Sequence, residues 1–238
     1  MWPNSSLSRL LGAAGKGAVS LLFPPRCFIC GASQAEPTPL CPRCLEELEV
    51  FSTELCVICG HPVKEGTDLC RECAVEPRPF AWARALGPHL GILRVLVLGM
   101  KEGERALARL LSGLLVPFLP RDAEIITFVP PDPGRKGTWH AAEGLARELS
   151  VLSGVPMEPL LVKIRSTPPQ VSLGYRERLR NLAGAFSSRR TGKGERVVLV
   201  DDVYTTGTTV TECSRALISA GFGEVVVLTA SRTIRHED

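Results

Sequence analysis

The order of apolar and polar residues predicts a domain of alternating helices and strands. Apolar residues recur at helical spacing in three segments, at 90–100, 105–119 and 139–152. Short, mostly apolar runs typical of buried strands occupy 125–129 and 159–164. Helices that alternate with buried strands indicate an α/β fold.

The C-terminal part of the chain contains a complete strand–helix–strand unit. An apolar run at 196–200 leads into Asp201 and Asp202, a Thr/Gly loop and a helical segment at 210–220, and a second apolar run at 225–228. Such a unit places both strands parallel in one sheet. We expect a mainly parallel sheet flanked by helices, with ligands bound at the carboxyl ends of its strands, where the two aspartates lie.

Ahead of this domain, eight cysteines form four Cys-x2-Cys pairs. They make two copies of Cys-x2-Cys-x10-Cys-x2-Cys, and the candidate metal ligands are Cys27, Cys30, Cys41, Cys44, Cys56, Cys59, Cys70 and Cys73. Four thiolates complete the tetrahedral coordination of a structural zinc ion. Gly31 and Gly60 follow the second cysteine of each copy, where the turn favours a positive φ. The spacing predicts about two zinc ions. It does not distinguish sequential from cross-braced sites, and we prefer sequential sites because each copy contains a complete set of four cysteines.

Other interpretations of the cysteines stay open. A disulfide framework suits a secreted chain, but we expect no export signal, and Cys213 is the only cysteine outside the repeats. Iron–sulfur ligation also takes four cysteines, although the duplicated spacing is more typical of zinc ribbons. His61 is either a substitute ligand or a surface turn residue, and we interpret Cys213 as a buried packing residue.

Composition and charge narrow the function classes further. Of the 238 residues 45% are hydrophobic, which excludes a wholly disordered chain, and 28 basic against 25 acidic residues give a formal charge of +3. The charge is uneven, because residues 163–196 contain nine basic and two acidic side chains. No apolar run reaches the ~20 residues of a membrane span, so we expect a cytoplasmic protein without one.

The loop after Asp202 has the composition of a phosphate-binding site. Its residues Thr205, Thr206, Gly207, Thr208 and Thr209 open a helix, where backbone N–H groups lack intrahelical acceptors and the helix dipole attracts anions. Asp201 and Asp202 can accept hydrogen bonds from neighbouring hydroxyls, so the two parts together favour a sugar phosphate. In the alternative interpretation, these are ordinary helix-capping and turn residues.

The segment 198–209 resembles the phosphoribosyl pyrophosphate motif of type I phosphoribosyltransferases. Together with the cysteine repeats, it is similar to the ComF family of competence-associated bacterial proteins, which join a zinc-binding N-terminus to a phosphoribosyltransferase domain. Smaller matches are the segment 22–27, Lys101, the Arg165-x-Thr167-x-x-Gln170 stretch and the segment 184–186.

The resemblance implies a role for each matching residue. Asp201 and Asp202, the catalytic candidates, would hold the ribose hydroxyls near the positive charge that develops at the anomeric carbon, and residues 205–209 would bind the 5-phosphate. Mg²⁺ would arrive with the diphosphate. Candidate contacts to the diphosphate are Lys101, Arg135, Lys136, Arg165, Gln170 and Arg176.

Two segments bear on catalysis. After the strand at 125–129 the family usually continues with an Arg-rich segment and a Gly-Phe-Asn-Gln stretch, whereas this chain reads PDPGRKGTWH at 131–140, where Asp132 opposes a diphosphate. The basic arm at 163–180 lies where type I enzymes carry a mobile loop that closes over the diphosphate. The alternative for this arm is a solvated basic surface.

These features predict a docking helix at 1–23, a duplicated zinc module at 24–79 and a phosphoribosyltransferase-like domain at 80–238. The resemblance implies phosphoribosyl pyrophosphate or a nucleotide as ligand and a role in DNA uptake or processing, with single-stranded DNA and competence or DNA-processing proteins as partners. We expect a phosphoribosyltransferase. The alternative is a non-catalytic sensor of phosphoribosyl ligands whose zinc module binds single-stranded DNA or a protein.

Overall fold

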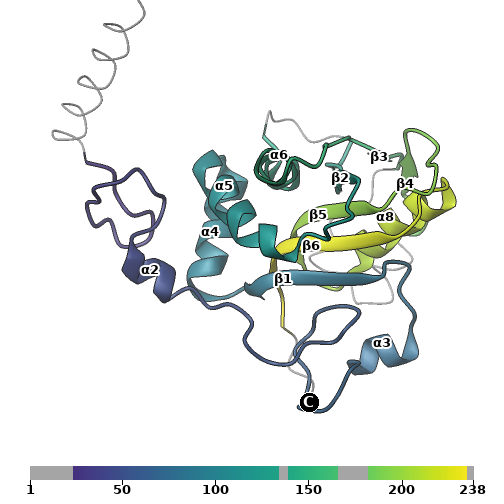
Figure 1. Ribbon diagram of the computed structural model, residues 1–238, viewed down its shortest axis with the longest axis horizontal. Helices are drawn as coiled ribbons and strands as arrows, with labels where there is room; N and C mark the ends of the chain where they lie inside the picture. The colour runs from purple at the N-terminus through teal and green to yellow at the C-terminus, as the bar shows by residue number, and fades with distance from the viewer. Residues whose placement is uncertain (1–23, 134–138, 166–181, 235–238) are drawn as a thin grey trace, which may run out of the picture. The chain divides into compact units, whose positions relative to one another are not determined.

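The computed structural model describes residues 24–133, 139–165 and 182–234 (Figure 1). The contacts along the chain define two compact units, with the division between Leu48 and Glu49. The smaller unit holds the first cysteine repeat, and the larger one holds the second repeat together with the sheet. The segment expected to dock as a helix, 1–23, lies outside the described residues. Within them, no helix has the length and apolar character that crossing a membrane requires.

A four-stranded parallel sheet forms the centre of the larger unit. Its order is β1–β6–β5–β2, with strands β1 (Trp82–Pro88), β2 (Ile125–Phe128), β5 (Val197–Tyr204) and β6 (Val225–Arg232). Valine and leucine dominate the first half of the two inner strands, β5 and β6, as expected for strands that are covered on both faces. A separate antiparallel pair consists of β3 (Leu161–Lys163) and β4 (Phe186–Ser188).

Helices cover both faces of the sheet. On one face pack α4 (Gly91–Glu102), α5 (Arg105–Leu115) and α6 (Ala141–Ser153), and the 3-10 helix η1 (Val116–Phe118) follows α5. Helix α8 (Thr208–Ser219) packs against β3, β4 and the central strands (Figure 1). After α6 the chain returns beside β2 at Met157, whereas α8 leads from β5 to β6, in the opposite direction across the sheet. Right-handed connections therefore place α6 and α8 on opposite faces.

Most predicted elements are confirmed, but several differ in length, among them β6, which continues past Leu228 to Arg232. The helix expected at 105–119 ends at Leu115, because Pro117 cannot continue an α-helical hydrogen-bond ladder and the chain turns into η1. Strand β5 continues past Val200 to Tyr204, since β6 is long enough to pair with it as far as Arg232. Asp201 and Asp202 therefore lie inside the strand rather than just after it.

The cysteine repeats contain one short helix each. Helix α2 (Pro42–Glu46) begins directly after Cys41, and α3 (Arg71–Val75) begins directly after Cys70. Each helix carries the last cysteine of its repeat on its first turns, buried toward the other three. The equivalent local structure of the two repeats agrees with their duplicated spacing.

Candidate functional site

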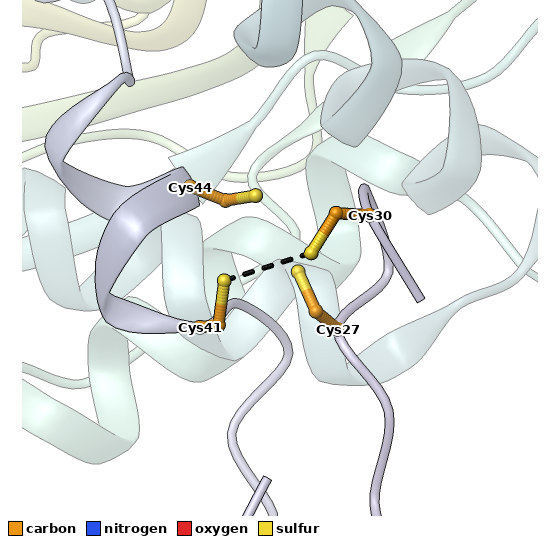
Figure 2. Close-up of side chains that lie close together, drawn as sticks. All are labelled: Cys27, Cys30, Cys41 and Cys44. Atoms are coloured by element: carbon orange, nitrogen blue, oxygen red, sulfur yellow. Dashed lines mark hydrogen bonds between the residues drawn. The ribbon is translucent and has the colours of Figure 1, made fainter. Parts of the chain in front are cut away.

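The eight cysteines gather in two groups of four, one for each repeat. Cys27, Cys30, Cys41 and Cys44 converge in the smaller unit (Figure 2), and Cys56, Cys59, Cys70 and Cys73 converge in the larger one. In each group all four sulfurs lie within 4.8 Å of one another. The Sγ atoms of Cys30 and Cys41 are 3.7 Å apart, and those of Cys59 and Cys70 are 3.6 Å apart. Tetrahedral Zn–S bonds of about 2.3 Å require sulfurs about 3.8 Å apart, so both groups fit a zinc ion.

This grouping settles two points left open by the spacing. Each repeat forms its own complete site, as expected, and His61 belongs to neither group. All nine cysteines are free thiols, which contradicts the disulfide alternative. Cys213 is fully buried on α8, and burial raises the pKa of its thiol well above the ordinary value, in agreement with a packing role.

One sulfur in each group is favoured as a thiolate. A hydrogen bond from the Cys73 thiol lowers the pKa of Cys59, burial opposes it, and the charge of Arg232 adds to it, so that the pKa falls to about 4. Burial would raise the pKa of Cys27, but backbone N–H groups of Cys30 and Cys41 outweigh it and bring the pKa to about 6. Thiolates are the form that binds zinc.

The two sites differ in their surroundings. The second group belongs to the hydrophobic cluster that also contains Phe80 and Tyr204, and all four of its cysteines are buried. In the first group Cys30 is exposed. Gly31 and Gly60 both take a positive φ, of 72° and 70°, as predicted, but a Cβ on Gly60 would lie 2.6 Å from the Ala83 carbonyl oxygen, whereas one on Gly31 would meet nothing within 4 Å.

Asp201 and Asp202 lie side by side in the last half of β5, but they do not share a face. Successive strand residues point to opposite sides of a sheet, and Asp202 reaches Lys101 at the end of α4, with 3.2 Å between Oδ1 and Nζ. The Asp201 carboxylate accepts a hydrogen bond from the Asp202 backbone N–H at 2.9 Å. Burial and the neighbouring charge of Asp202 raise the pKa of Asp201 to about 8.

The loop between β5 and α8 has an inner and an outer set of side chains. Thr206 and Thr208 are buried, and their hydroxyl oxygens lie 2.7 Å apart. Thr206 also accepts a hydrogen bond from the Thr208 backbone N–H at 3.3 Å. Thr205 is exposed and Thr209 half-buried. The hydroxyls of Thr205 and Thr209, rather than all four, are therefore the ones available to a ligand.

The backbone of this loop depends on a glycine. Gly207 has a φ of 74° and directly precedes α8, whose first N–H groups lack intrahelical acceptors. A Cβ at this position would lie 2.1 Å from the Tyr204 hydroxyl oxygen. The Tyr204 ring therefore packs directly against the loop backbone at Gly207. This arrangement leaves the helix N-terminus open to an anion.

Two residues at the same edge of the sheet were not predicted from the sequence. His89, directly after β1, has Nδ1 2.8 Å from the Ser231 hydroxyl of β6. Burial lowers the pKa of His89, and the charges of Lys101 and Arg94 lower it further, while Asp202 opposes the shift. A residue directly after a parallel strand is a candidate for a ligand site, so His89 could have been found if β1 had been predicted, but it was not.

The predicted diphosphate contacts fall partly outside the described residues. Lys101 contacts Asp202, and Arg165 donates a hydrogen bond to the Ala183 carbonyl at 3.0 Å. The remaining candidates, Arg135, Lys136, Gln170 and Arg176, lie in the segments 134–138 and 166–181, which the structure does not describe.

Several cations of the basic arm and its neighbours already have acidic partners. Lys163 pairs with Asp132, the residue that opposes a diphosphate after β2. Arg190 contacts both Glu158 and Glu195, at 3.0 and 2.9 Å. Arg196 contacts Asp122 and Glu224. These ion pairs offset three of the nine basic side chains of the 163–196 segment.

Comparison with protein families identifies both parts of the chain. Residues 18–74 match the family described as "Double zinc ribbon domain", and residues 121–233 match the "Phosphoribosyl transferase domain". The chain is 35% identical over 97 residues to "Competence protein F" of Haemophilus influenzae, a match that covers 39% of this chain and 42% of the relative. It is 39% identical over 74 residues to "DNA utilization protein YhgH" of Escherichia coli K12, covering 31% and 33%.

The matched part spans only 42% and 33% of the length of these two curated relatives. Among solved structures, the glutamine phosphoribosylpyrophosphate amidotransferase of B. subtilis complexed with ADP and GMP aligns with 51% of this chain and 25% of that one, at 26% identity and a TM-score of 0.38. The double zinc ribbon, the phosphoribosyltransferase domain and the competence and DNA-utilization relatives together show that the chain belongs to the ComF family.

Proposed function

We propose that the larger unit binds phosphoribosyl pyrophosphate at the carboxyl edge of β5 and transfers its phosphoribosyl group to an acceptor. The observation that carries this proposal is the order of groups at that edge: two aspartates at the end of a central parallel strand, then a glycine-dependent turn, then a helix N-terminus. Carboxylates suit the ribose hydroxyls, and the helix N-terminus suits the 5-phosphate. Because the aspartates and the helix N-terminus are adjacent, they favour a ligand that carries both ribose hydroxyls and a phosphate.

The loop would hold the 5-phosphate by backbone and hydroxyl donors. Thr205 and Thr209 present the accessible hydroxyls, and the backbone N–H groups of the first turn of α8 lack intrahelical acceptors. Thr206 and Thr208 contribute indirectly, because their mutual hydrogen bond fixes the turn. Gly207 takes the left-handed conformation, with a φ of 74°, through which the loop enters α8.

The two aspartates would stabilise the charge that develops as pyrophosphate leaves. The pKa of Asp201 is raised by burial and by Asp202, so a positively charged anomeric carbon nearby favours its ionised form. The side chain of Asp202 contacts Lys101 at the end of α4, with 3.2 Å between Oδ1 and Nζ. Mg²⁺, when bound with the diphosphate, supplies charge neutralisation mainly through substrate oxygens.

The enzyme proposal is tested by pyrophosphate release from the full chain with Mg²⁺, phosphoribosyl pyrophosphate and a panel of nucleobases. We expect release with at least one acceptor, and its loss in the Asp201→Asn/Asp202→Asn variant. Asp122→Asn is the matched control, because this aspartate lies on a loop before β2 and pairs with Arg196. Absence of release across the panel, with the ligand still bound, would contradict transfer.

One observation favours the second candidate function, a sensor that binds the ligand without turnover. Lys163 is paired with Asp132, so at this point of the loop after β2 a carboxylate and an ammonium cancel one another. A diphosphate leaving group needs positive charge there. A sensor predicts that phosphoribosyl pyrophosphate binds but that no pyrophosphate is released.

We further propose single-stranded DNA as a partner. The names of the relatives, which concern competence and DNA utilization, support this assignment. The candidates for contacts to its phosphates are Arg176, Arg178 and Arg180 of the basic arm, because the sequence places three arginines within five residues there. The same names support competence or DNA-processing proteins as partners, and a cytoplasmic location follows from such a role.

A further inference from the structure

The second cysteine group is built into the sheet that carries the candidate phosphoribosyl site. The backbone N–H of Ala83 in β1 donates to the Ile58 carbonyl at 2.6 Å, within the turn between Cys56 and Cys59. A Cβ on Gly60 would contact the carbonyl of Ala83, so the turn lies directly against β1. A zinc ion in this site would therefore fix the turn at 56–60, which packs against β1.

Arg232 connects this group to the sheet interior. It is the last residue of β6 and is 5% exposed. Its Nη1 donates to the Cys59 carbonyl at 2.6 Å, and its Nη2 lies 3.6 Å from the Cys59 sulfur. Among the described residues its Nε has no acceptor. The contacts to Cys59 are thus the polar contacts that fix this guanidinium.

The same guanidinium lies on the face of Tyr204. Its central carbon is 4.3 Å from the centre of the Tyr204 ring, in cation–π geometry. Arg232 and Tyr204 are also paired residues of β6 and β5. The ring is 3% exposed, and its hydroxyl has no hydrogen-bond partner within the described part of the chain. Packing, rather than a hydrogen bond, therefore sets its position.

The far end of the Tyr204 ring meets the phosphate loop at Gly207, where the hydroxyl occupies the space of a Cβ. A continuous line of contacts thus runs from Cys59 through Arg232 and Tyr204 to Gly207. The first cysteine group, in the smaller unit, has no counterpart to this line among the described contacts: Gly31 meets nothing, and Cys30 is exposed. The two zinc sites are therefore structurally unequal.

We propose that Arg232 is a positioning residue that makes the conformation of the 205–209 loop depend on the second zinc site and not on the first. It touches the ligand site only through Tyr204. Loss of the ion would release the Cys59 carbonyl and sulfur, and Arg232 and Tyr204 would lose their fixed positions beneath Gly207. The consequence for ligand affinity rests on the proposed function, whereas the conformational coupling does not.

The test is hydrogen exchange of the loop peptide in the full zinc-loaded chain, without ligand. Cys70→Ser and Cys41→Ser are matched variants, because each removes the third ligand of its repeat. We expect Cys70→Ser to speed exchange around residues 204–210 by at least tenfold, and Cys41→Ser to leave it unchanged. Equal loop exchange in both variants would overturn the proposal.

Arg232→Lys separates coupling from unfolding. It keeps the charge but cannot reach both the Cys59 backbone and the Tyr204 face as a planar fork. We expect two zinc ions to be retained, β2 exchange to stay slow and loop exchange to rise. If Arg232→Lys leaves the loop as protected as in the wild type, the proposal is wrong, even where Cys70→Ser unfolds the unit. Failure of the wild type to bind phosphoribosyl pyrophosphate would count only against the proposed function.

Discussion

At the scale of single residues, the site combines a carboxyl group whose ionisation is unfavourable, Asp201, with a loop position that tolerates no side chain, Gly207. Asp201 is held in β5 by backbone pairing with Thr229, next to the charge of Asp202. Burial and the charge of Asp202 raise the pKa of Asp201 to about 8, and perturbed carboxyl groups of this kind are typical of functional sites. Gly207 is equally constrained, because Tyr204 fills the space beside its Cα.

Asp201→Asn should stabilise the protein above neutral pH. Because the pKa of Asp201 is raised to about 8 in the folded state from an ordinary value of 3.8, the folded protein holds a proton that the unfolded chain releases, and stability falls as pH rises between these values. We expect the variant to gain about 1–3 kcal/mol in unfolding free energy at pH 8 relative to wild type, and nothing at pH 4.

Denaturant unfolding at the two pH values measures this difference. Asp122→Asn is a control of opposite sign, because hydrogen bonding from Arg196 lowers the pKa of Asp122, so its ionised form favours the folded state at neutral pH. If the unfolding free energies of the wild type and of Asp201→Asn changed equally with pH, the raised pKa of Asp201 would be contradicted.

Gly207→Ala should abolish ligand binding. The new Cβ would meet the Tyr204 hydroxyl at 2.1 Å and would force a left-handed conformation on a residue with a side chain. We expect at least a hundredfold loss of affinity for phosphoribosyl pyrophosphate in calorimetry, with both zinc ions retained. Gly113→Ala on α5, where a Cβ meets nothing within 4 Å, is the control and should bind normally.

At the scale of elements, the two cysteine repeats share one local structure and differ in what lies against them. Both turns place a glycine at a φ near 70°, and both begin a short helix after the third cysteine. The second repeat lies against β1 and within the hydrophobic cluster of the larger unit, whereas a Cβ on Gly31 of the first repeat would meet nothing within 4 Å. The two copies of the cysteine motif therefore share a local structure but differ in the residues that surround them.

The pair Gly31→Ala and Gly60→Ala isolates this difference. Both substitutions strain the same left-handed conformation, at a cost of about 1–2 kcal/mol. Gly60→Ala additionally drives a Cβ to 2.6 Å from the Ala83 carbonyl, so β1 or the turn must shift. We expect Gly60→Ala to lower the thermal unfolding temperature of the sheet-containing unit and Gly31→Ala to leave it unchanged. Equal effects of both would show that the second repeat does not support β1.

The elements that could be predicted from the sequence are those whose pattern is local. The cysteine spacing and the β5–α8–β6 unit depend on residues close in the chain, and both were predicted. Strand β1 was missed because Arg84 interrupts its apolar pattern and its partner is β6, with Trp82 opposite Val226. The pairs His89–Ser231 and Cys59–Arg232 span 142 and 173 residues, so no local pattern indicates them.

At the scale of the whole molecule, the chain joins one separate zinc unit to a larger unit in which a second zinc site, a parallel sheet and the candidate phosphoribosyl site share one core. The sequence predicts a duplicated zinc module at 24–79, and in the structure Ala83 and Arg232 make hydrogen bonds to the second repeat of this module. Metal analysis should give about two zinc ions per chain. A value near zero in the folded protein would contradict both sites.

The DNA proposal predicts a salt-dependent affinity that depends on the arm. The double variant Arg176→Glu/Arg178→Glu should weaken binding of single-stranded DNA and lower the salt slope by about 1.4, since each arginine that neutralises a phosphate contributes about 0.7. Arg109→Glu/Arg147→Glu is the control with equal charge change, at exposed positions already paired with Glu148 and Glu143. Equal losses in both variants would indicate an effect of net charge alone.

Calorimetric titration of the zinc-loaded full chain with phosphoribosyl pyrophosphate and Mg²⁺ tests the central claim most directly. The account predicts saturable binding of one ligand per chain, lost in the Asp201→Asn/Asp202→Asn variant and retained in Asp122→Asn. A folded chain with both zinc ions in place that gives no binding heat at several temperatures, or a double variant that binds as well as wild type, would contradict the assignment of the β5–α8 edge as a phosphoribosyl site.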